Sequence, residues 1–95
     1  MGWITSQQAD DDLQWIAEQG IERHGVQQAR RYTSQFMAFF DLLALNPKMG
    51  PERTTSSGPV RLMPCGRHHI VYVERGSDLH IVRVLHGLQN WQEII

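Results

Sequence analysis

The N-terminal half of the chain repeats apolar residues with the period of an α-helix. Between Gln7 and Arg23 they recur at spacings of three and four, which predicts an amphipathic helix. They are Ala9, Leu13, Ile16, Ala17 and Ile21. Thr5 or Ser6 is placed to cap this helix, and the acidic run 10–12 lies in its first turns, where negative charge suits the helix macrodipole. We therefore interpret the run as a helix-start signal and not as a metal site.

A second helix is predicted after the break at His24 and Gly25. It ends at Asn46, because Pro47 disfavours helical geometry in the residue before it. Its apolar stripe consists of Val26, Ala29, Tyr32, Phe36, Met37, Phe40, Leu43 and Ala44, and Phe39 widens it. The opposite face is polar and should be solvated. Two consecutive amphipathic helices joined by a glycine predict a helical hairpin.

The C-terminal half changes to the two-residue period of β-strands. Alternating segments at 60–65, 69–74 and 79–86 are separated by short connections, so they should form an antiparallel meander. The segment 3–5 is a weaker candidate for an edge strand. These elements predict an α+β fold in which a two-helix hairpin packs on a three- to four-stranded twisted antiparallel sheet. The predicted layout of the single domain 1–95 is a hairpin at about 7–46, a loop at 47–58, the sheet at 59–86 and a tail at 87–95.

Composition limits the classes of function. Ninety-five residues suffice for one small core, and a net charge of -1 provides no overall cationic field for nucleic acid or an anionic membrane. No segment is long and apolar enough for a membrane span. The single cysteine, Cys65, excludes an internal disulfide and is typical of a reducing compartment. We therefore expect a cytoplasmic protein with no direct contact to nucleic acid or membrane.

The five histidines do not predict a metal site. His68 and His69 are adjacent on a strand and should point to opposite faces, whereas His80 and His86 should share a face about 20 Å apart at ~3.3 Å per residue. Zinc-binding spacings such as Cys-x-x-Cys or His-Glu-x-x-His do not occur. No metal and no cofactor are expected.

A ribonuclease is the enzyme class to weigh. Cleavage through the 2′-hydroxyl needs a proton acceptor, a proton donor and cations facing the phosphate. The sheet segments supply these residue types in Arg61, Arg67, Arg83, His69 and His86. Alternatively, Arg61 and Arg83 form cross-strand ion pairs with Glu74 or Asp78, as half-solvated sheets commonly do. From the residues alone we favour ion pairing.

Four segments in chain order resemble a known family. They are "ADDDLQWIAEQG" from Ala9, "LLALNPKMGPER" from Leu42, "RHHIVYVER" from Arg67 and "IVRVLHG" from Ile81. Each is weak alone, but the ordered set is similar to the ParE branch of the RelE/ParE superfamily, the toxins of bacterial toxin–antitoxin pairs. The resemblance implies a helical hairpin against a twisted antiparallel sheet.

The resemblance also separates two activities. RelE-like toxins cut messenger RNA in the ribosome and carry a tyrosine or histidine near the C-terminus, but the tail "LQNWQEII" has no Tyr, His, Lys or Arg. His69 stands where a RelE-like enzyme would have an arginine. ParE-like toxins are associated with poisoning DNA gyrase by binding, which makes His86 a structural brace at the end of the last strand. The alternatives are a ribosome-dependent endoribonuclease using Arg61, Arg67, Arg83 and His86, and a non-toxic interaction module.

The partner that the resemblance implies is an antitoxin whose flexible C-terminal segment wraps the toxin. Apolar helix positions, sheet edges and an apolar tail offer docking sites for it. The candidate antitoxin- or target-binding residues are Trp15, Phe39, Leu45, Arg61, Arg83, Leu88, Trp91 and Ile95. The competing interpretation is that the large apolar ones complete the core. Because the tail is expected to form a short helical turn outside the main core, Trp91 should matter more for binding than for folding.

Overall fold

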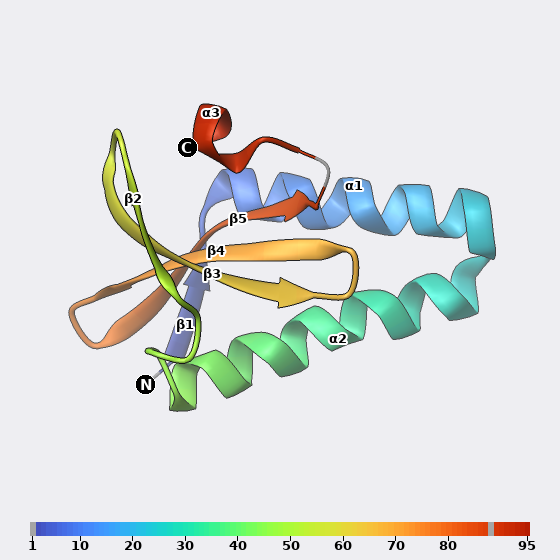
Figure 1. Cartoon of the computed structure of the whole chain (residues 1–95). Helices are drawn as coiled ribbons and strands as arrows, with labels where there is room; N and C mark the ends of the chain where they lie inside the picture. The colour runs from blue at the N-terminus through green and yellow to red at the C-terminus, as the bar shows by residue number, and fades with distance from the viewer. Residues whose placement is uncertain (1, 88) are drawn as a thin grey trace.

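The computed structural model describes residues 2–87 and 89–95, which form a two-layer α+β fold (Figure 1). In chain order the elements are β1 (Gly2–Thr5), α1 (Gln7–His24), α2 (Val26–Leu45), β2 (Glu52–Thr55), β3 (Gly58–Cys65), β4 (His68–Arg75), β5 (Asp78–His86) and α3 (Trp91–Ile94). The predicted fold class, the helical hairpin and the three main strands are confirmed.

Both ends of the hairpin follow the predicted signals. Ser6 is the N-cap of α1, and its hydroxyl accepts a hydrogen bond from the backbone N–H of Ala9 at 3.0 Å. Gly25 separates the helices with a φ of 85°, a conformation that favours glycine, and its N–H donates to the carbonyl of Ile21. α2 ends at Leu45, two residues before Pro47. Local sequence therefore sets the length of each helix.

The sheet differs from the prediction in strand number and direction. Its order is β1-β5-β4-β3-β2, and β1 runs parallel to β5 while every other pair is antiparallel. The predicted three- to four-stranded antiparallel sheet is thus a five-stranded mixed sheet. The predicted loop 47–58 was wrong in part, because Glu52–Thr55 forms the edge strand β2. Its residues are nearly all exposed, so it lacks the alternation that marks a half-buried strand.

A β-bulge interrupts the pairing of β4 and β5. Val71 pairs with Arg83 and Tyr72 pairs with Ile81, so Val82 is an extra residue on β5. The extra residue reverses the inside-outside alternation for the rest of β5. The prediction that His80 and His86 share a face is therefore wrong.

The two faces of the sheet support two apolar clusters. The larger one joins the hairpin to the sheet and contains Ala9, Ile16, Phe36, Phe40, Leu43, Cys65, Ile70, Tyr72, Leu79, Ile81 and Val84. The smaller one lies on the outer face and contains Val60, Leu62, Val71 and Leu85, with Trp91 and Ile95 of the tail packed against it. The tail is helical only from Trp91, after the N-cap Asn90, and not directly after Gly87 as predicted. Leu88 lies outside the described residues.

The hairpin extends beyond the β3–β4 turn (Figure 1). Ile21 and Val26 lie near its tip and are 46% and 48% exposed, since the sheet does not reach them. Both were predicted as core positions of their stripes. In the described part of the chain, neither helix of the hairpin is apolar enough over its length to cross a membrane.

Candidate functional site

Arg83 is held by α1 at the open edge of β5. Its Nε donates to Oδ2 of Asp12 at 2.7 Å and its Nη2 to Oδ1 at 2.9 Å, while the same Oδ2 accepts the backbone N–H of Val84 at 2.9 Å. β1 pairs with β5 only as far as Ile81. Beyond that residue the Asp12 carboxylate, and not a neighbouring strand, accepts a backbone hydrogen bond from the edge of β5. The hydrogen bond to Asp12 raises the pKa of Arg83 above its ordinary value. The predicted cross-strand partners of Arg83 were therefore wrong, because its counter-ion comes from the first helix.

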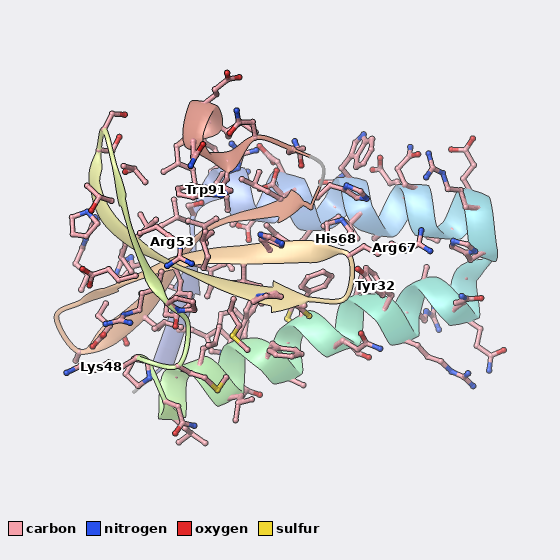
Figure 2. All side chains as sticks on the ribbon, in the orientation of Figure 1. Tyr32, Lys48, Arg53, Arg67, His68 and Trp91 are labelled. Atoms are coloured by element: carbon pink, nitrogen blue, oxygen red, sulfur yellow. The ribbon has the colours of Figure 1, made fainter. Side chains whose placement is uncertain are left out.

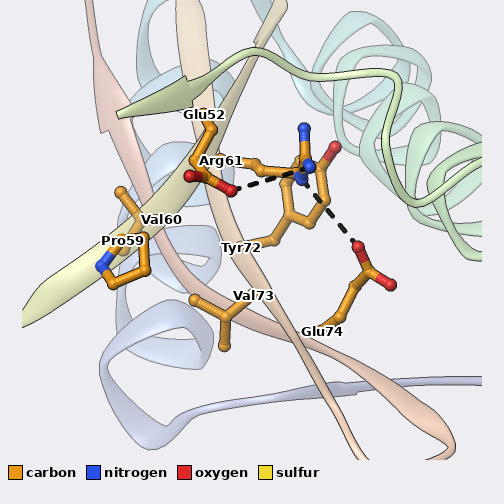
Figure 3. A pocket seen from close by; sticks show the side chains of 7 residues that line it. All are labelled: Glu52, Pro59, Val60, Arg61, Tyr72, Val73 and Glu74. Atoms are coloured by element: carbon orange, nitrogen blue, oxygen red, sulfur yellow. Dashed lines mark ion pairs between the residues drawn. The ribbon is translucent and has the colours of Figure 1, made fainter. Parts of the chain in front are cut away.

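Arg61 lies between two carboxylates and a loop (Figure 3). Its guanidinium is 3.7 Å from Glu52 and 3.8 Å from Glu74, which confirms the predicted pairing with Glu74. Its Nη1 also donates to the carbonyl of Gly50 at 2.8 Å. The shallow pocket around it has a volume of about 160 Å³ and is lined by Glu52, Pro59, Val60, Arg61, Tyr72, Val73 and Glu74. Two acidic side chains at this pocket oppose binding of a phosphate.

Arg67 lies in the β3–β4 turn, away from both of those arginines. Its backbone N–H donates to the hydroxyl of Tyr32 at 3.0 Å, and its carbonyl accepts the N–H of Gly87 at 2.8 Å. Figure 2 shows Arg67 beside Tyr32 and His68, at the opposite end of the sheet from Lys48. The three candidate arginines thus lie in different surroundings: Arg61 between Glu52 and Glu74, Arg83 beside Asp12, and Arg67 in the β3–β4 turn.

His68 is buried between the hairpin and the sheet. Its Nδ1 lies 2.7 Å from the hydroxyl oxygen of Tyr32, which already accepts the N–H of Arg67. The tyrosine proton is then directed to Nδ1, and the imidazole carries its own proton on Nε2. Burial, together with the neighbouring His86 and His69, lowers the pKa of His68 to about 4. His68 is therefore a neutral core residue at physiological pH.

His86 occupies the position predicted for a brace. It pairs with His68 across the strands, with ring centroids 5.2 Å apart. Its backbone N–H donates to the side-chain carbonyl of Gln89 at 2.7 Å, and its carbonyl accepts the N–H of Gln89 at 2.9 Å. These contacts turn the chain at the end of β5 and support a structural role.

The apolar docking residues that the structure describes fall into three groups. Trp15 and Leu45 are 59% and 77% exposed, so both are available to a partner. Phe39 is half-buried against the larger cluster, which favours the core interpretation for this residue. Trp91 and Ile95 lie against the outer face of the sheet, and the hydroxyl of Ser57 donates to the carbonyl of Ile95 at 3.2 Å.

The position of the tail changes the expected effect of Trp91→Ala. Because Trp91 covers the smaller cluster, we expect this substitution to lower the free energy of unfolding by about 1 to 2 kcal/mol, somewhat less than full burial of a large side chain is worth. Urea denaturation of the variant measures it, and Gln92→Ala on the exposed side of α3 is the matched control. Equal midpoints for Trp91→Ala and the control would show that the tail contributes nothing to folding.

Sequence reasoning missed the interactions that hold the loop after α2. The hydroxyl of Tyr72 donates to the carbonyl of Pro47 at 2.9 Å and accepts the N–H of Gly50 at 2.8 Å. A Cβ at Gly50 would lie 2.7 Å from that hydroxyl, which only glycine avoids. Tyr72 is fully buried, and burial raises its pKa. The only sequence signal was a tyrosine on the apolar face of a strand, where a hydroxyl needs a partner.

Among residues 2–87 and 89–95, no three histidine, cysteine or acidic side chains gather as a metal site would require. Cys65 is buried, and its burial raises the pKa of the thiol to about 11, which makes it a poor nucleophile. Large apolar side chains such as those of Trp15 and Leu45 remain exposed at the surface. Such groups are suited to protein contact.

Comparison with known proteins agrees with this geometry. The family model described as "ParE toxin of type II toxin-antitoxin system, parDE" matches residues 4–91. Toxin ParE1 of Caulobacter vibrioides is 33% identical over 86 residues, which are 90% of this chain and 88% of that protein. A chain of the solved structure "Chromosomal ParDE TA system from P. aeruginosa" has the same fold, with a TM-score of 0.78 and 17% identity over 90% of this chain and 95% of that one. The chain therefore belongs to the ParE toxin family of type II toxin–antitoxin systems.

Proposed function

We propose that this toxin acts by binding and poisoning DNA gyrase, without catalysis, and that a cognate antitoxin neutralises it in a hetero-oligomer. The observation that carries the proposal is the pairing of Arg61 and Arg83 with carboxylates of the same chain. An RNA-cleaving sheet needs arginines that face a phosphate, whereas these two stabilise the toxin itself. A toxin that acts by binding needs no arginine free to contact a phosphate, and it can use its exposed apolar side chains instead.

The antitoxin has two kinds of docking site on this surface. Trp15 on α1 exposes a large apolar side chain, which an amphipathic segment can cover. β2 is the last strand of the sheet, so an extended segment can add to its outer edge. A flexible antitoxin segment that uses both kinds of site would wrap the toxin.

A supercoiling assay with purified gyrase tests the proposed target. Toxin free of antitoxin should inhibit supercoiling at micromolar excess, and toxin preincubated with its antitoxin should not. Trp15→Ser, at an exposed position, should weaken neutralisation more than it changes the melting temperature. Absence of inhibition by the free toxin would contradict gyrase as the target.

The same preparation distinguishes the other classes of function. Cleavage of messenger RNA on added ribosomes by the wild type would identify the ribonuclease, and Arg67→Ala would then test the one candidate arginine that forms no ion pair within the described residues. Expression without antitoxin that leaves growth unchanged would identify a non-toxic interaction module.

A further inference from the structure

The loop between α2 and β2 is unusually well fixed for a segment at the surface. Tyr72 and Arg61, both on the sheet, bind the carbonyls of Pro47 and Gly50 and the N–H of Gly50. The N–H of Asn46 donates to the carbonyls of Leu42 and Leu43, and that of Met49 to the carbonyl of Asn46. Backbone groups of the loop are therefore bound from the sheet and from the helix end.

The side chains of Leu45, the last residue of α2, and of the loop that follows it contribute little to the core. Leu45 is 77% exposed and Met49 is 39% exposed. Lys48 is also exposed, and it forms no ion pair with any described acidic residue. Residues Asn46, Pro47, Lys48 and Met49 line an open hollow of about 460 Å³. We call Leu45 to Met49 the α2 corner.

We infer that the α2 corner is the surface through which the toxin contacts its folded target protein, at a site where that protein presents an apolar side chain next to a carboxylate. The hollow and Leu45 receive the apolar group, and Lys48, which lacks a counter-ion among the described residues, pairs with the carboxylate. The inference rests on the proposed function, because it assumes a protein target.

The form of the α2 corner suits a folded target more than the flexible antitoxin. A flexible segment loses conformational entropy when it binds, and it offsets that loss by covering a long groove or strand edge. The α2 corner is only five residues long, and Tyr72 and Arg61 already bind its carbonyls at Pro47 and Lys48, so a folded partner can bind it with little ordering on either side. Tyr72 and Arg61 are thus positioning residues for this contact.

The double variant Leu45→Ser/Lys48→Glu tests the inference. Both side chains are exposed, so the melting temperature should remain close to that of the wild type. We expect the toxin concentration for half-inhibition of gyrase to rise about tenfold or more, while the antitoxin dissociation constant changes by less than about threefold. Val26→Ser/Arg30→Glu makes the same changes of polarity and charge on exposed positions at the other end of α2 and should inhibit like the wild type.

The outcomes separate failure of the inference from failure of the gyrase proposal. Unchanged inhibition, or a larger loss of antitoxin affinity than of inhibition, would overturn the inference. Should wild-type toxin not inhibit gyrase at all, growth arrest on expression without antitoxin replaces the readout, and Leu45→Ser/Lys48→Glu should then relieve the arrest while Val26→Ser/Arg30→Glu does not. Arrest that persists in the first variant at equal protein level would overturn the inference for any target.

Tyr72→Phe tests whether fixation of the loop matters. It removes only the hydroxyl that binds Pro47 and Gly50, so the side chains of the α2 corner remain but lose their support. Half-inhibition should require several-fold more toxin, and hydrogen exchange at Gly50 should become faster in the free toxin. Faster exchange with unchanged inhibition would show that the α2 corner need not be rigid.

Discussion

Replacing Asp12 by alanine should lower the free energy of unfolding by about 3 kcal/mol, because the substitution leaves Arg83 without its counter-ion in a mostly buried position. The backbone N–H of Val84 loses its acceptor in the same step. Urea denaturation at neutral pH measures the change. Asp11→Ala is the matched control, since the Asp11 side chain is exposed and accepts one hydrogen bond, from Gln7 of the same helix.

A double variant distinguishes the free energy lost with the ion pair itself from the cost of leaving the Arg83 charge unpaired. Asp12→Ala/Arg83→Met removes both charges and fills the guanidinium site with an apolar chain, so it should be less destabilised than the sum of the single variants. Additive effects would show that Asp12 and Arg83 do not interact energetically. A loss for Asp12→Ala no larger than for Asp11→Ala would contradict the role of Asp12 at the edge of β5.

His68 should make the stability of the toxin depend on pH. Its folded-state pKa of about 4 lies below the ordinary value of 6.5, so the imidazole is neutral in both states above pH 6.5. Between these values the unfolded state binds a proton that the folded state does not, which favours unfolding as the pH falls. The loss should reach up to about 3 kcal/mol near pH 4 and then level off, because each pKa unit corresponds to about 1.36 kcal/mol.

Comparison of the wild type with His68→Asn isolates this contribution. The asparagine side-chain oxygen can still accept the hydrogen bond from Tyr32, but it does not titrate. Urea midpoints across the acidic range should therefore fall more steeply for the wild type than for the variant. His24→Asn removes an exposed imidazole at the end of α1 and serves as control. Parallel curves for wild type and His68→Asn would mean that the burial of His68 does not depress its protonation.

Local pattern predicted the parts of the fold that local interactions determine. The helices were predicted with their ends, because Ser6, Gly25 and Pro47 act on their neighbours in the chain. β2 was missed because its exposed polar residues depend on pairing with β3 and not on a buried face. The direction of β1 and the bulge at Val82 were missed because both result from pairing between distant segments.

The candidate site was predicted less well for the same reason. The acidic run offers three equivalent carboxylates in sequence, and only the packing of α1 on β5 selects Asp12 as the partner of Arg83. Trp15 and Leu45 are exposed, and their role in docking stays a prediction. Phe39, which periodicity placed at the margin of the apolar stripe, packs against the larger cluster. The hydrogen bond from Tyr72 to Pro47 joins residues 25 positions apart in the sequence, so no local motif predicts it.

The attachment of the first strand to the last has a consequence for when the fold is completed during synthesis. Gly2–Thr5 pairs with β5, Ser6 binds the carbonyl of Val82, and Asp12 binds Arg83, over separations of 76 and 71 residues for the last two contacts. Such long-range contacts slow folding, because the chain must close a long loop before they form. During synthesis they cannot form until β5 has left the ribosome. Translation that stops before β5 therefore releases only the hairpin and part of the sheet, so a folded toxin exists only after nearly the whole chain has been made.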